Sequence, residues 1–320
     1  MEQLLSIENL SVDFAMRTGT LRAVNDVNLA IDQGERLGLV GESGAGKSVL
    51  GFSVINLISK PGYIASGRIL FRGEEISKYD ANRMRKIRGN RISMIFQDPM
   101  MTLNPVLTIG AQMRETLRAH TDLSGPQIND ICIEKLKKVY IASPARRLEQ
   151  YPHEFSGGMR QRIVIAISLL TSPNLIIADE PTTALDVTIQ AEIMDLLLEL
   201  CQTEQMGLLL ITHDLAVVSQ VTQRIAVMYA GTIVELGPSG RIIHHPKHPY
   251  TIGLLGALPQ RSAKSARLNQ IPGVMPGLAK IPPGCPFNDR CHLAADICRQ
   301  SRPALETKTG GSRAACHMVA

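Results

Sequence analysis

A glycine-rich stretch at residues 41–48 contains the residue types best suited to chemistry in this chain. It reads Gly41-Glu42-Ser43-Gly44-Ala45-Gly46-Lys47-Ser48, which fits the pattern of a glycine, four free positions and then Gly-Lys-Ser. In that pattern the glycines let successive backbone N–H groups point inward at phosphate oxygens. Lys47 would reach the β- and γ-phosphates of a nucleotide, and Ser48 would hold Mg²⁺. The alternative is a glycine- and serine-rich turn that carries a lysine by chance.

Short apolar segments flank this stretch on both sides. Residues 36–40, Arg-Leu-Gly-Leu-Val, suit a buried strand, and residues 49–55, Val-Leu-Gly-Phe-Ser-Val-Ile, can begin a helix. Strand, loop and helix is the context that a phosphate loop requires. The positive end of the helix dipole would then lie behind the loop and favour bound phosphate.

Two adjacent carboxylates, Asp179 and Glu180, end an apolar run that begins at Leu175. The run is typical of a buried strand, and Pro181 ends it directly after the carboxylates. A parallel strand beside the phosphate loop would bring Asp179 to the Mg²⁺ and Glu180 to the attacking water. Adjacent carboxylates on a surface loop would be unremarkable, so this interpretation depends on the strand.

Polar side chains also end two further predicted strands. Residues 91–96 lead to Gln97, and Pro99 prevents the strand from continuing. At a strand end next to a phosphate site, Gln97 could position metal or water. His213 follows the apolar run 208–212, where a contact with a γ-phosphate would be useful. A lone histidine, however, is more often structural than catalytic.

A second anion site is predicted at Ser156, Gly157 and Gly158, which lead into an apolar helix at residues 163–170. Ser156 suits the N-cap, and the glycine pair leaves backbone N–H groups uncovered at the start of the helix. The triplet alone is a weak signal. Its position shortly before the strand that ends at Asp179 makes the signal strong.

The chain before the phosphate loop is predicted to form antiparallel strands. Residues 7–14 and 24–31 alternate apolar and polar side chains. Phe14 could stack on a purine ring, although an isolated phenylalanine in a strand is usually part of the core.

The middle of the chain is predicted to be helical. Residues 108–148 show a helical pattern, with Pro126 and Pro144 as interruptions. Sustained heptads are absent from this stretch, so it does not predict a coiled coil.

The composition is that of a soluble globular protein, with 44% hydrophobic and 20% charged residues. Apolar runs such as residues 163–167 are far shorter than the roughly 20 residues that span a bilayer. The N-terminus lacks the layout of a secretory signal, so we expect a cytoplasmic protein. A net charge of +5 is too small to indicate nucleic acid or anionic lipid, and only 4% of residues are aromatic, which argues against stacking platforms for single strands.

Taken in order, these motifs resemble those of the nucleotide-binding subunit of an ATP-binding cassette (ABC) transporter, over roughly residues 4–258. The matching segments are Walker A at 41–48, the Q-loop residue Gln97, the signature Ser156 to Met159, the Walker B pair Asp179 and Glu180, the D-loop Ala184-Leu185-Asp186 and the switch histidine His213. Phe14 corresponds to the aromatic residue that stacks on adenine. In the signature, Phe155 and Met159 replace the common Leu and Gln, but the serine and the backbone donors remain.

The resemblance implies an α/β fold of the P-loop NTPase type. It would have a RecA-like core, an antiparallel β subdomain and a helical signature subdomain at about 98–165, within an ABC domain at 1–258. Two cassettes would meet head to tail to enclose ATP. Glu180, His213 and Gln97 would be catalytic, and Ser48, Gln97 and Asp179 would hold Mg²⁺. The other implied nucleotide contacts are Phe14, residues 41–48 except Glu42, the signature residues Ser156, Gly157 and Gly158, and Asp186.

The composition changes after residue 258, where prolines and glycines punctuate a region with little periodicity. Four of the six cysteines lie here, at Cys285, Cys291, Cys298 and Cys316. Disulfides are disfavoured in the cytoplasm, so metal binding is the leading interpretation. The spacing matches neither the close pairs of zinc sites nor the better-known ferredoxin pattern. Zinc, an iron-sulfur cluster and unligated thiols therefore stay open on the residues alone.

A second resemblance concerns this C-terminal region. Residues 245–251, His-Pro-Lys-His-Pro-Tyr-Thr, with Leu258-Pro259 and Gly284-Cys285-Pro286, resemble the C-terminal extension of dipeptide and oligopeptide importer ATPases. The resemblance implies an extension at 259–320 in which Cys285, Cys291, Cys298 and Cys316 bind a 4Fe-4S cluster, with zinc as the alternative.

The implied function is that of an ATPase that powers the import of di- or oligopeptides. Its implied partners are a sister ATPase or an identical copy, two transmembrane permease subunits and, indirectly, an extracytoplasmic substrate-binding protein, with no nucleic acid. It would lie at the cytoplasmic face of the membrane.

Three other functions are weighed against this one. A nickel, glutathione or other solute importer would use the same cassette. An ABC ATPase acting on DNA or ribosomes would carry a long coiled coil or a second cassette, and neither is present. A regulatory subunit that binds ATP without hydrolysing it is disfavoured by Glu180 and His213.

Overall fold

The computed structural model of this chain describes residues 3–183, 185–257 and 270–319. The chain forms two compact units: residues 78–209 make up the first, and the described parts of residues 2–77 and 210–320 make up the second. Strand β8 (Gly207–Thr212) contains one boundary between them, and the turn η1 (Ile76–Lys78) contains the other. The domain boundary predicted between residues 258 and 259 lies outside the described residues.

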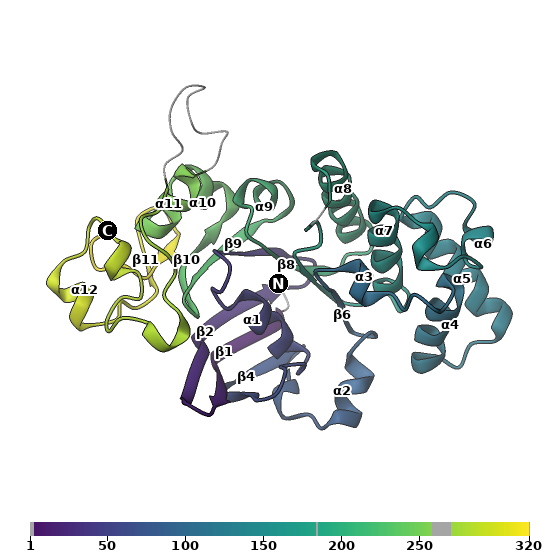
Figure 1. The fold of residues 1–320 in the computed structure, drawn as a ribbon, viewed down its shortest axis with the longest axis horizontal. Coiled ribbons are helices and arrows are strands. Elements are labelled where there is room, and N and C mark those ends of the chain that lie inside the picture. Colours follow the sequence, from purple (N-terminus) through teal and green to yellow (C-terminus); the bar gives the residue numbers. More distant parts are fainter. Residues whose placement is uncertain (1–2, 184, 258–269, 320) are drawn as a thin grey trace. The chain divides into compact units, whose positions relative to one another are not determined.

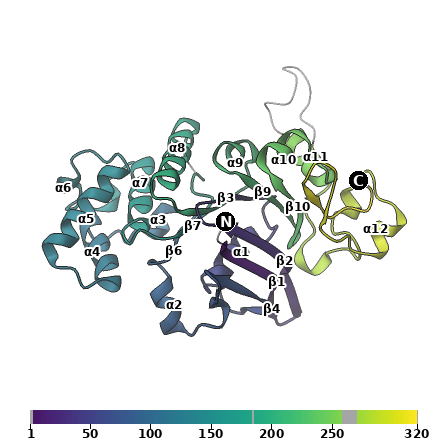
Figure 2. The same cartoon turned by 180° about the vertical axis from the view of Figure 1, so that it is seen from behind.

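An antiparallel sheet forms the N-terminal part of the second unit, with strand order β2-β1-β4-β5. Its strands are β1 (Gln3–Met16), β2 (Gly19–Asp32), β4 (Gly62–Phe71) and β5 (Glu74–Glu75). The strands predicted at 7–14 and 24–31 are the central parts of β1 and β2, which pair with Leu10 opposite Val27. Figure 2 shows β2, β1 and β4 side by side.

A second set of strands in this unit carries the phosphate loop. β3 (Arg36–Val40) lies parallel to β9 (Arg224–Tyr229), which pairs antiparallel with β10 (Thr232–Pro238). The short strands β12 (Arg313–Ala314) and β11 (Glu306–Thr307) follow at the edge. The apolar side chains of β3 and β9 are buried, the continuous pattern typical of parallel strands. Helix α1 (Lys47–Val54) follows β3, as predicted.

Short helices complete the second unit. They are α9 (Leu215–Val221), α10 (Ser239–His244), α11 (Pro249–Gly256) and α12 (Asp296–Gln300), with the turns η4 (Leu278–Lys280) and η5 (Asn288–Arg290). The rings of Tyr229, Tyr250 and Phe287 pack with centroids 4.6 to 5.4 Å apart. Residues near the C-terminus therefore share a core with β9.

The first unit joins a pair of parallel strands, β6 (Ile92–Ile95) and β7 (Leu175–Asp179), to a group of helices. The helical elements are α2 (Ala81–Ile87), α3 (Pro99–Thr102), α4 (Ile109–His120), α5 (Gly125–Lys138), α6 (Pro144–Arg147), η2 (Pro152–Glu154), α7 (Gly157–Ser168) and α8 (Val187–Thr203). Helices α4, α5 and α7 pack against one another (Figure 1).

The two prolines of the predicted helical stretch begin helices rather than interrupt them. Pro126 lies in the first turn of α5, and Pro144 lies in the first turn of α6. Proline is tolerated there because the first N–H groups of a helix have no partner within it. Residues 108–148 are therefore three helices instead of one broken helix.

The strongly apolar runs of the chain are buried strands and helices. Side chains Leu175, Ile176, Ile177 and Ala178 of β7 are 0% exposed, as are Leu208 to Ile211 of β8. Within the three described ranges, no helix is both long enough and apolar enough to pass through a membrane.

Candidate nucleotide site

The phosphate loop curves between the end of β3 and the start of α1, within the second unit. Gly46 is the N-cap of α1 with φ +100°, and as a glycine it has no side chain with which to cap the helix. A Cβ at Gly46 would lie 2.6 Å from the carbonyl oxygen of Ala23, so only glycine fits. The loop therefore keeps an uncapped helix N-terminus behind it, the arrangement that binds phosphate.

The turn between β9 and β10 supports the loop from one side. The N–H of Gly231 donates to the carbonyl of Ala45 at 2.9 Å. A Cβ at Gly41 would lie 2.2 Å from the carbonyl oxygen of Met228, which explains a glycine at the first position of the motif. The loop shape is thus held by backbone contacts with β9 and its turn.

Lys47 is 5% exposed, and its ammonium lies inside the curve of the loop. Its Nζ donates to the carbonyl of Gly41 at 2.8 Å and to the carbonyl of Glu42 at 3.0 Å. Ser48 follows it in the first turn of α1 and is half-buried, whereas Ser43 and Gly44 are exposed. A buried ammonium beside the first backbone N–H groups of a helix is a donor set that suits a chain of phosphates.

In the first unit, Gln97 and Glu180 lie in contact. Gln97 Nε2 donates to Glu180 Oε2 at 3.1 Å, and the hydroxyl of Thr183 donates to the same oxygen at 2.9 Å. Glu180 has φ +47°, a left-handed conformation that costs a non-glycine residue about 1–3 kcal/mol. Asp179, at the end of β7, is 3% exposed. The structure therefore brings two of the predicted catalytic residues together and adds Thr183.

The signature residues begin α7, also in the first unit. Ser156 is the N-cap, and its Oγ accepts from the N–H of Met159 at 3.4 Å. A Cβ at Gly158 would lie 2.8 Å from Ile189 of α8. Asp186, the N-cap of α8, is exposed.

The close approach of α8 explains why a small residue stands at position 158. Leu185 lies near Gly157, where an added Cβ would be 3.5 Å away. Ala184, the first residue of the predicted D-loop, lies outside the described residues.

The remaining predicted nucleotide contacts, Phe14 and His213, belong to the second unit. Phe14 on β1 is half-buried and pairs with Gly62 on β4, where an added Cβ would lie 2.8 Å from the Phe14 ring. His213 is exposed and follows β8 directly. Next to it, Asp214 caps α9 by accepting from the N–H groups of Ala216 and Val217. The half-exposed ring and the exposed imidazole are thus accessible to a ligand.

The prediction of a 4Fe-4S cluster, with zinc as its alternative, is wrong. Among residues 3–183, 185–257 and 270–319, no three or more His, Cys, Asp or Glu side chains are placed to hold a metal ion. Cys285, Cys291, Cys298 and Cys316 line one small hollow, but Phe287 and prolines line it as well.

Three residues of the site were missed by sequence reasoning. Thr183 donates to Glu180, Tyr250 accepts from the N–H of Glu42 at 2.8 Å, and Arg290 forms an ion pair with Glu42 at 2.7 Å. Only Thr183 carries a local signal, since it lies three residues after the carboxylate. The other two are distant from Glu42 in sequence: Tyr250 belongs to the 245–251 motif, which did not indicate a contact with the loop, and no motif marks Arg290.

The comparisons with known proteins cover almost the whole chain. The ABC transporter family matches residues 24–183, and the family described as the oligopeptide/dipeptide transporter C-terminal region matches residues 234–298. The dipeptide transport ATP-binding protein DppD of Escherichia coli (strain K12) is 46% identical over 314 residues, which are 98% of this chain and 96% of DppD. The chain belongs to the ABC transporter family. The predicted family, an ABC ATPase of its peptide-importer branch, is confirmed.

Solved structures agree with this ABC ATPase in fold. The ATP-binding cassette MJ0796, a dimer bound to ADP and Pi, matches with a TM-score of 0.66 and 27% identity, covering 74% of this chain and 99% of that one. The protein cbiO1 of Clostridium perfringens, part of the ABC transporter complex cbiONQ, matches with a TM-score of 0.66 and 26% identity, covering 77% of this chain and 92% of cbiO1. The predicted fold class and the prediction of an ATP-hydrolysing enzyme are confirmed.

Proposed function

We propose that this ABC ATPase uses ATP bound at residues 41–48 to power the import of di- or oligopeptides through separate membrane subunits. The observation that carries the proposal is the buried Lys47 ammonium inside a loop that ends in an uncapped helix N-terminus. Phosphates of ATP would take over the contacts that Lys47 now makes with the loop carbonyls. Ser48, Gln97 and Asp179 would hold the Mg²⁺, which neutralises charge on the transferred phosphoryl group.

The proposed chemistry is removal of a proton from the attacking water by Glu180. Gln97 and Thr183 donate to the same carboxylate oxygen, so they hold the carboxylate in one orientation. That oriented carboxylate supports a general-base role. His213, exposed after β8, would contact the γ-phosphate, and Phe14 would stack on adenine.

The signature would act on the nucleotide of a second cassette. Ser156, Gly157 and Gly158 present the N-terminus of α7, which suits an anion, and Asp186 is exposed at the start of α8. The dimeric structure of MJ0796 supports the pairing of two cassettes, and we propose that they meet head to tail. The partner would be a sister ATPase, with an identical copy as the alternative.

Transport would require other chains. We assign residues 1–258 to the ABC domain, with a helical subdomain at about 98–165, and residues 259–320 to the importer-type extension. Two permease subunits would cross the membrane, an extracytoplasmic protein would deliver the peptide, and this chain would lie on the cytoplasmic face. The name of DppD supports peptides over nickel or glutathione, and nucleic acid has no part in the proposal.

The test has two arms. In the first, Lys47→Ala is compared with Lys137→Ala, which changes an exposed lysine on α5. Binding of a fluorescent ATP analogue should be lost only in Lys47→Ala. In the second, the tagged chain is purified from its native membranes, and the complex is assayed for ATP-dependent peptide uptake in vesicles. Normal ATP binding by Lys47→Ala, or uptake of another solute class only, would overturn the proposal.

A further inference from the structure

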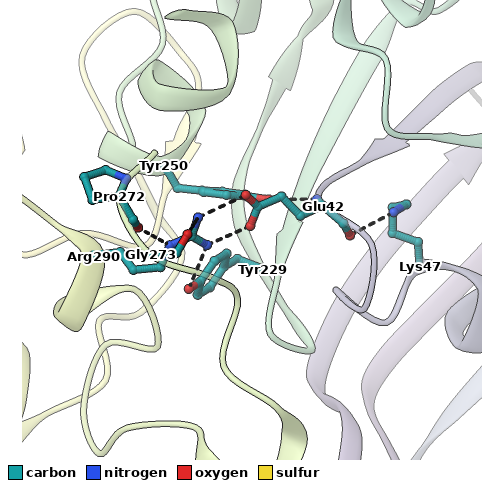
Figure 3. A network of polar contacts seen from close by, with 7 residues as sticks. All are labelled: Glu42, Lys47, Tyr229, Tyr250, Pro272, Gly273 and Arg290. Atoms are coloured by element: carbon teal, nitrogen blue, oxygen red, sulfur yellow. Dashed lines mark hydrogen bonds and ion pairs between the residues drawn. The ribbon is translucent and has the colours of Figure 1, made fainter. Parts of the chain in front are cut away.

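An arginine near the C-terminus contacts the phosphate loop directly. Arg290, the last residue of η5, faces Glu42, the second residue of the loop, across 248 positions of sequence. Its Nη1 donates to Glu42 Oε2 at 2.7 Å, and its Nη2 donates to Glu42 Oε1 at 3.1 Å (Figure 3). Two parallel charge-assisted hydrogen bonds of this kind fix the orientation of both side chains.

All five N–H groups of the Arg290 guanidinium have acceptors. Besides Glu42, Nε donates to the carbonyl of Pro272 at 2.8 Å, Nη1 to the hydroxyl of Tyr229 at 3.4 Å and Nη2 to the carbonyl of Gly273 at 3.4 Å. The Arg290 side chain is only 7% exposed. A lysine has three donors and no planar fork, so it would not reproduce this set.

Aromatic side chains contact the backbone of Glu42 and pack beside Arg290. The hydroxyl of Tyr250, a residue that is 0% exposed, accepts the backbone N–H of Glu42 at 2.8 Å (Figure 3). The Phe287 ring lies 5.4 Å from the Tyr250 ring and 5.2 Å from the Tyr229 ring. Glu42 is therefore held at its carboxylate and at its N–H by residues outside the loop.

The third contact of Glu42 leads to the lysine of the motif. Its carbonyl accepts from Lys47 Nζ at 3.0 Å, so the Glu42 carbonyl, together with the carbonyl of Gly41, holds the ammonium. We propose that Arg290 is a positioning residue for the phosphate loop, through which the C-terminal segment (residues 270–319) controls the affinity for nucleotide. This inference rests on the proposed function, because it concerns the same loop.

The expected effect falls on binding and not on the chemical step. Without Arg290, the Glu42 carboxylate loses its ion pair, and only Tyr250 still contacts the Glu42 N–H through a side chain. Lys47 then meets the phosphates from a less ordered starting position. The residues proposed for hydrolysis, Glu180 and Asp179, are unchanged, so kcat should be preserved.

The first experiment measures Kd and KM for ATP, together with kcat, on the full chain with Arg290→Ala. Both Kd and KM should rise about tenfold, within the usual range of coupling between sites, with kcat changed less than twofold. Arg290→Lys should recover only part of the affinity. Arg299→Ala is the matched control, because Arg299 is 59% exposed and pairs with Asp296 on α12. Equal affinity of the Arg290→Ala and Arg299→Ala proteins would overturn the inference.

A double-mutant cycle tests whether the effect passes through Glu42. Glu42→Gln alone should weaken ATP binding, and adding Arg290→Ala should then weaken it less than twofold further. Additive losses would overturn the inference. Glu42→Gln also tests the inference if the Arg290→Ala protein fails to fold. Normal ATP affinity of the Glu42→Gln protein would show that the contact between Glu42 and Arg290 does not control nucleotide binding.

Lys47→Ala separates this inference from the proposed function. If Lys47→Ala abolishes ATP binding while the Arg290 and Glu42 variants bind normally, the function stands and the inference is wrong. If Lys47→Ala binds ATP normally, the proposed function itself is wrong.

Discussion

Replacement of Glu180 by glutamine removes a base while leaving its surroundings in place. Gln97 and Thr183 donate to Glu180 Oε2 at 3.1 and 2.9 Å, and the amide oxygen of a glutamine accepts the same two hydrogen bonds. The backbone at position 180 must adopt φ +47° in both proteins, so the substitution adds no new backbone strain. The Glu180→Gln protein should therefore fold and bind ATP as the original does.

The expected loss of hydrolysis rate follows from the proposed role of Glu180 as the general base. A positioned general base contributes about 10² to 10⁴ in rate. Its loss would raise the activation free energy by about 3 to 5 kcal/mol. Because Lys47 keeps its contacts with the loop carbonyls, Kd for ATP should change less than about threefold, a difference below 1 kcal/mol.

The assay is single-turnover hydrolysis at saturating ATP and Mg²⁺, with binding of a fluorescent ATP analogue measured on the same preparation. Glu192→Gln is the control, because Glu192 is a half-exposed carboxylate on α8 that pairs with Arg162. Hydrolysis by Glu180→Gln at more than about a third of the control rate would refute the base assignment. A loss of ATP binding would instead show that Glu180 acts on the nucleotide itself.

Three further predictions concern neighbours of the site. Thr183→Val removes one of the donors that orient the Glu180 carboxylate, so kcat should fall by up to about 100-fold, the cost of a misplaced catalytic group. Thr183→Ser should stay near normal in the same hydrolysis assay. Gly158→Ala places a Cβ 2.8 Å from Ile189 and should lower the free energy of unfolding, measured by urea titration, by about 1–3 kcal/mol. Gly240→Ala is the control: its added Cβ would meet no atom within 4 Å, so the free energy of unfolding should stay unchanged or rise. Burial lowers the pKa of His248 from 6.5 to about 4, so between these pH values the unfolded chain binds more protons than the folded chain. The free energy of unfolding should therefore fall by up to about 3 kcal/mol through His248 as the pH falls from 7 to 4. Urea midpoints that depend equally on pH in the His248→Gln protein would contradict this.

Local patterns were sufficient for the elements that carry the site. The glycines and lysine of residues 41–48, between an apolar run and a helix start, predicted a strand, a loop and a helix that the structure contains at β3 and α1. Such patterns succeed because turn residues and hydrophobic periodicity act over a few neighbouring positions. Pro126 and Pro144 were predicted as interruptions of the helical stretch, and each lies in the first turn of a new helix, where proline is tolerated.

Side-chain convergence was much harder to predict. The number of cysteines after residue 258, and the expected cytoplasmic location, predicted a metal cluster. Spacing in sequence, however, says nothing of where four thiols point. The described residues contain no group of side chains placed to bind a metal. Thr183 lies only three residues after Glu180, but its type and position did not predict a hydrogen bond to the carboxylate. That bond forms where Glu180 takes a left-handed conformation, with φ +47°, which the sequence did not indicate.

The sequence by itself determined the chemistry this protein has available: a phosphate loop, a carboxylate after a buried strand and a serine at a helix start. Residue types and short spacings suffice for that, since each motif is a local backbone form. Tertiary structure alone decided that Arg290 and Tyr250 hold Glu42, because contacts between residues 248 and 208 positions apart depend on how distant strands and helices pack. No local pattern encodes that packing.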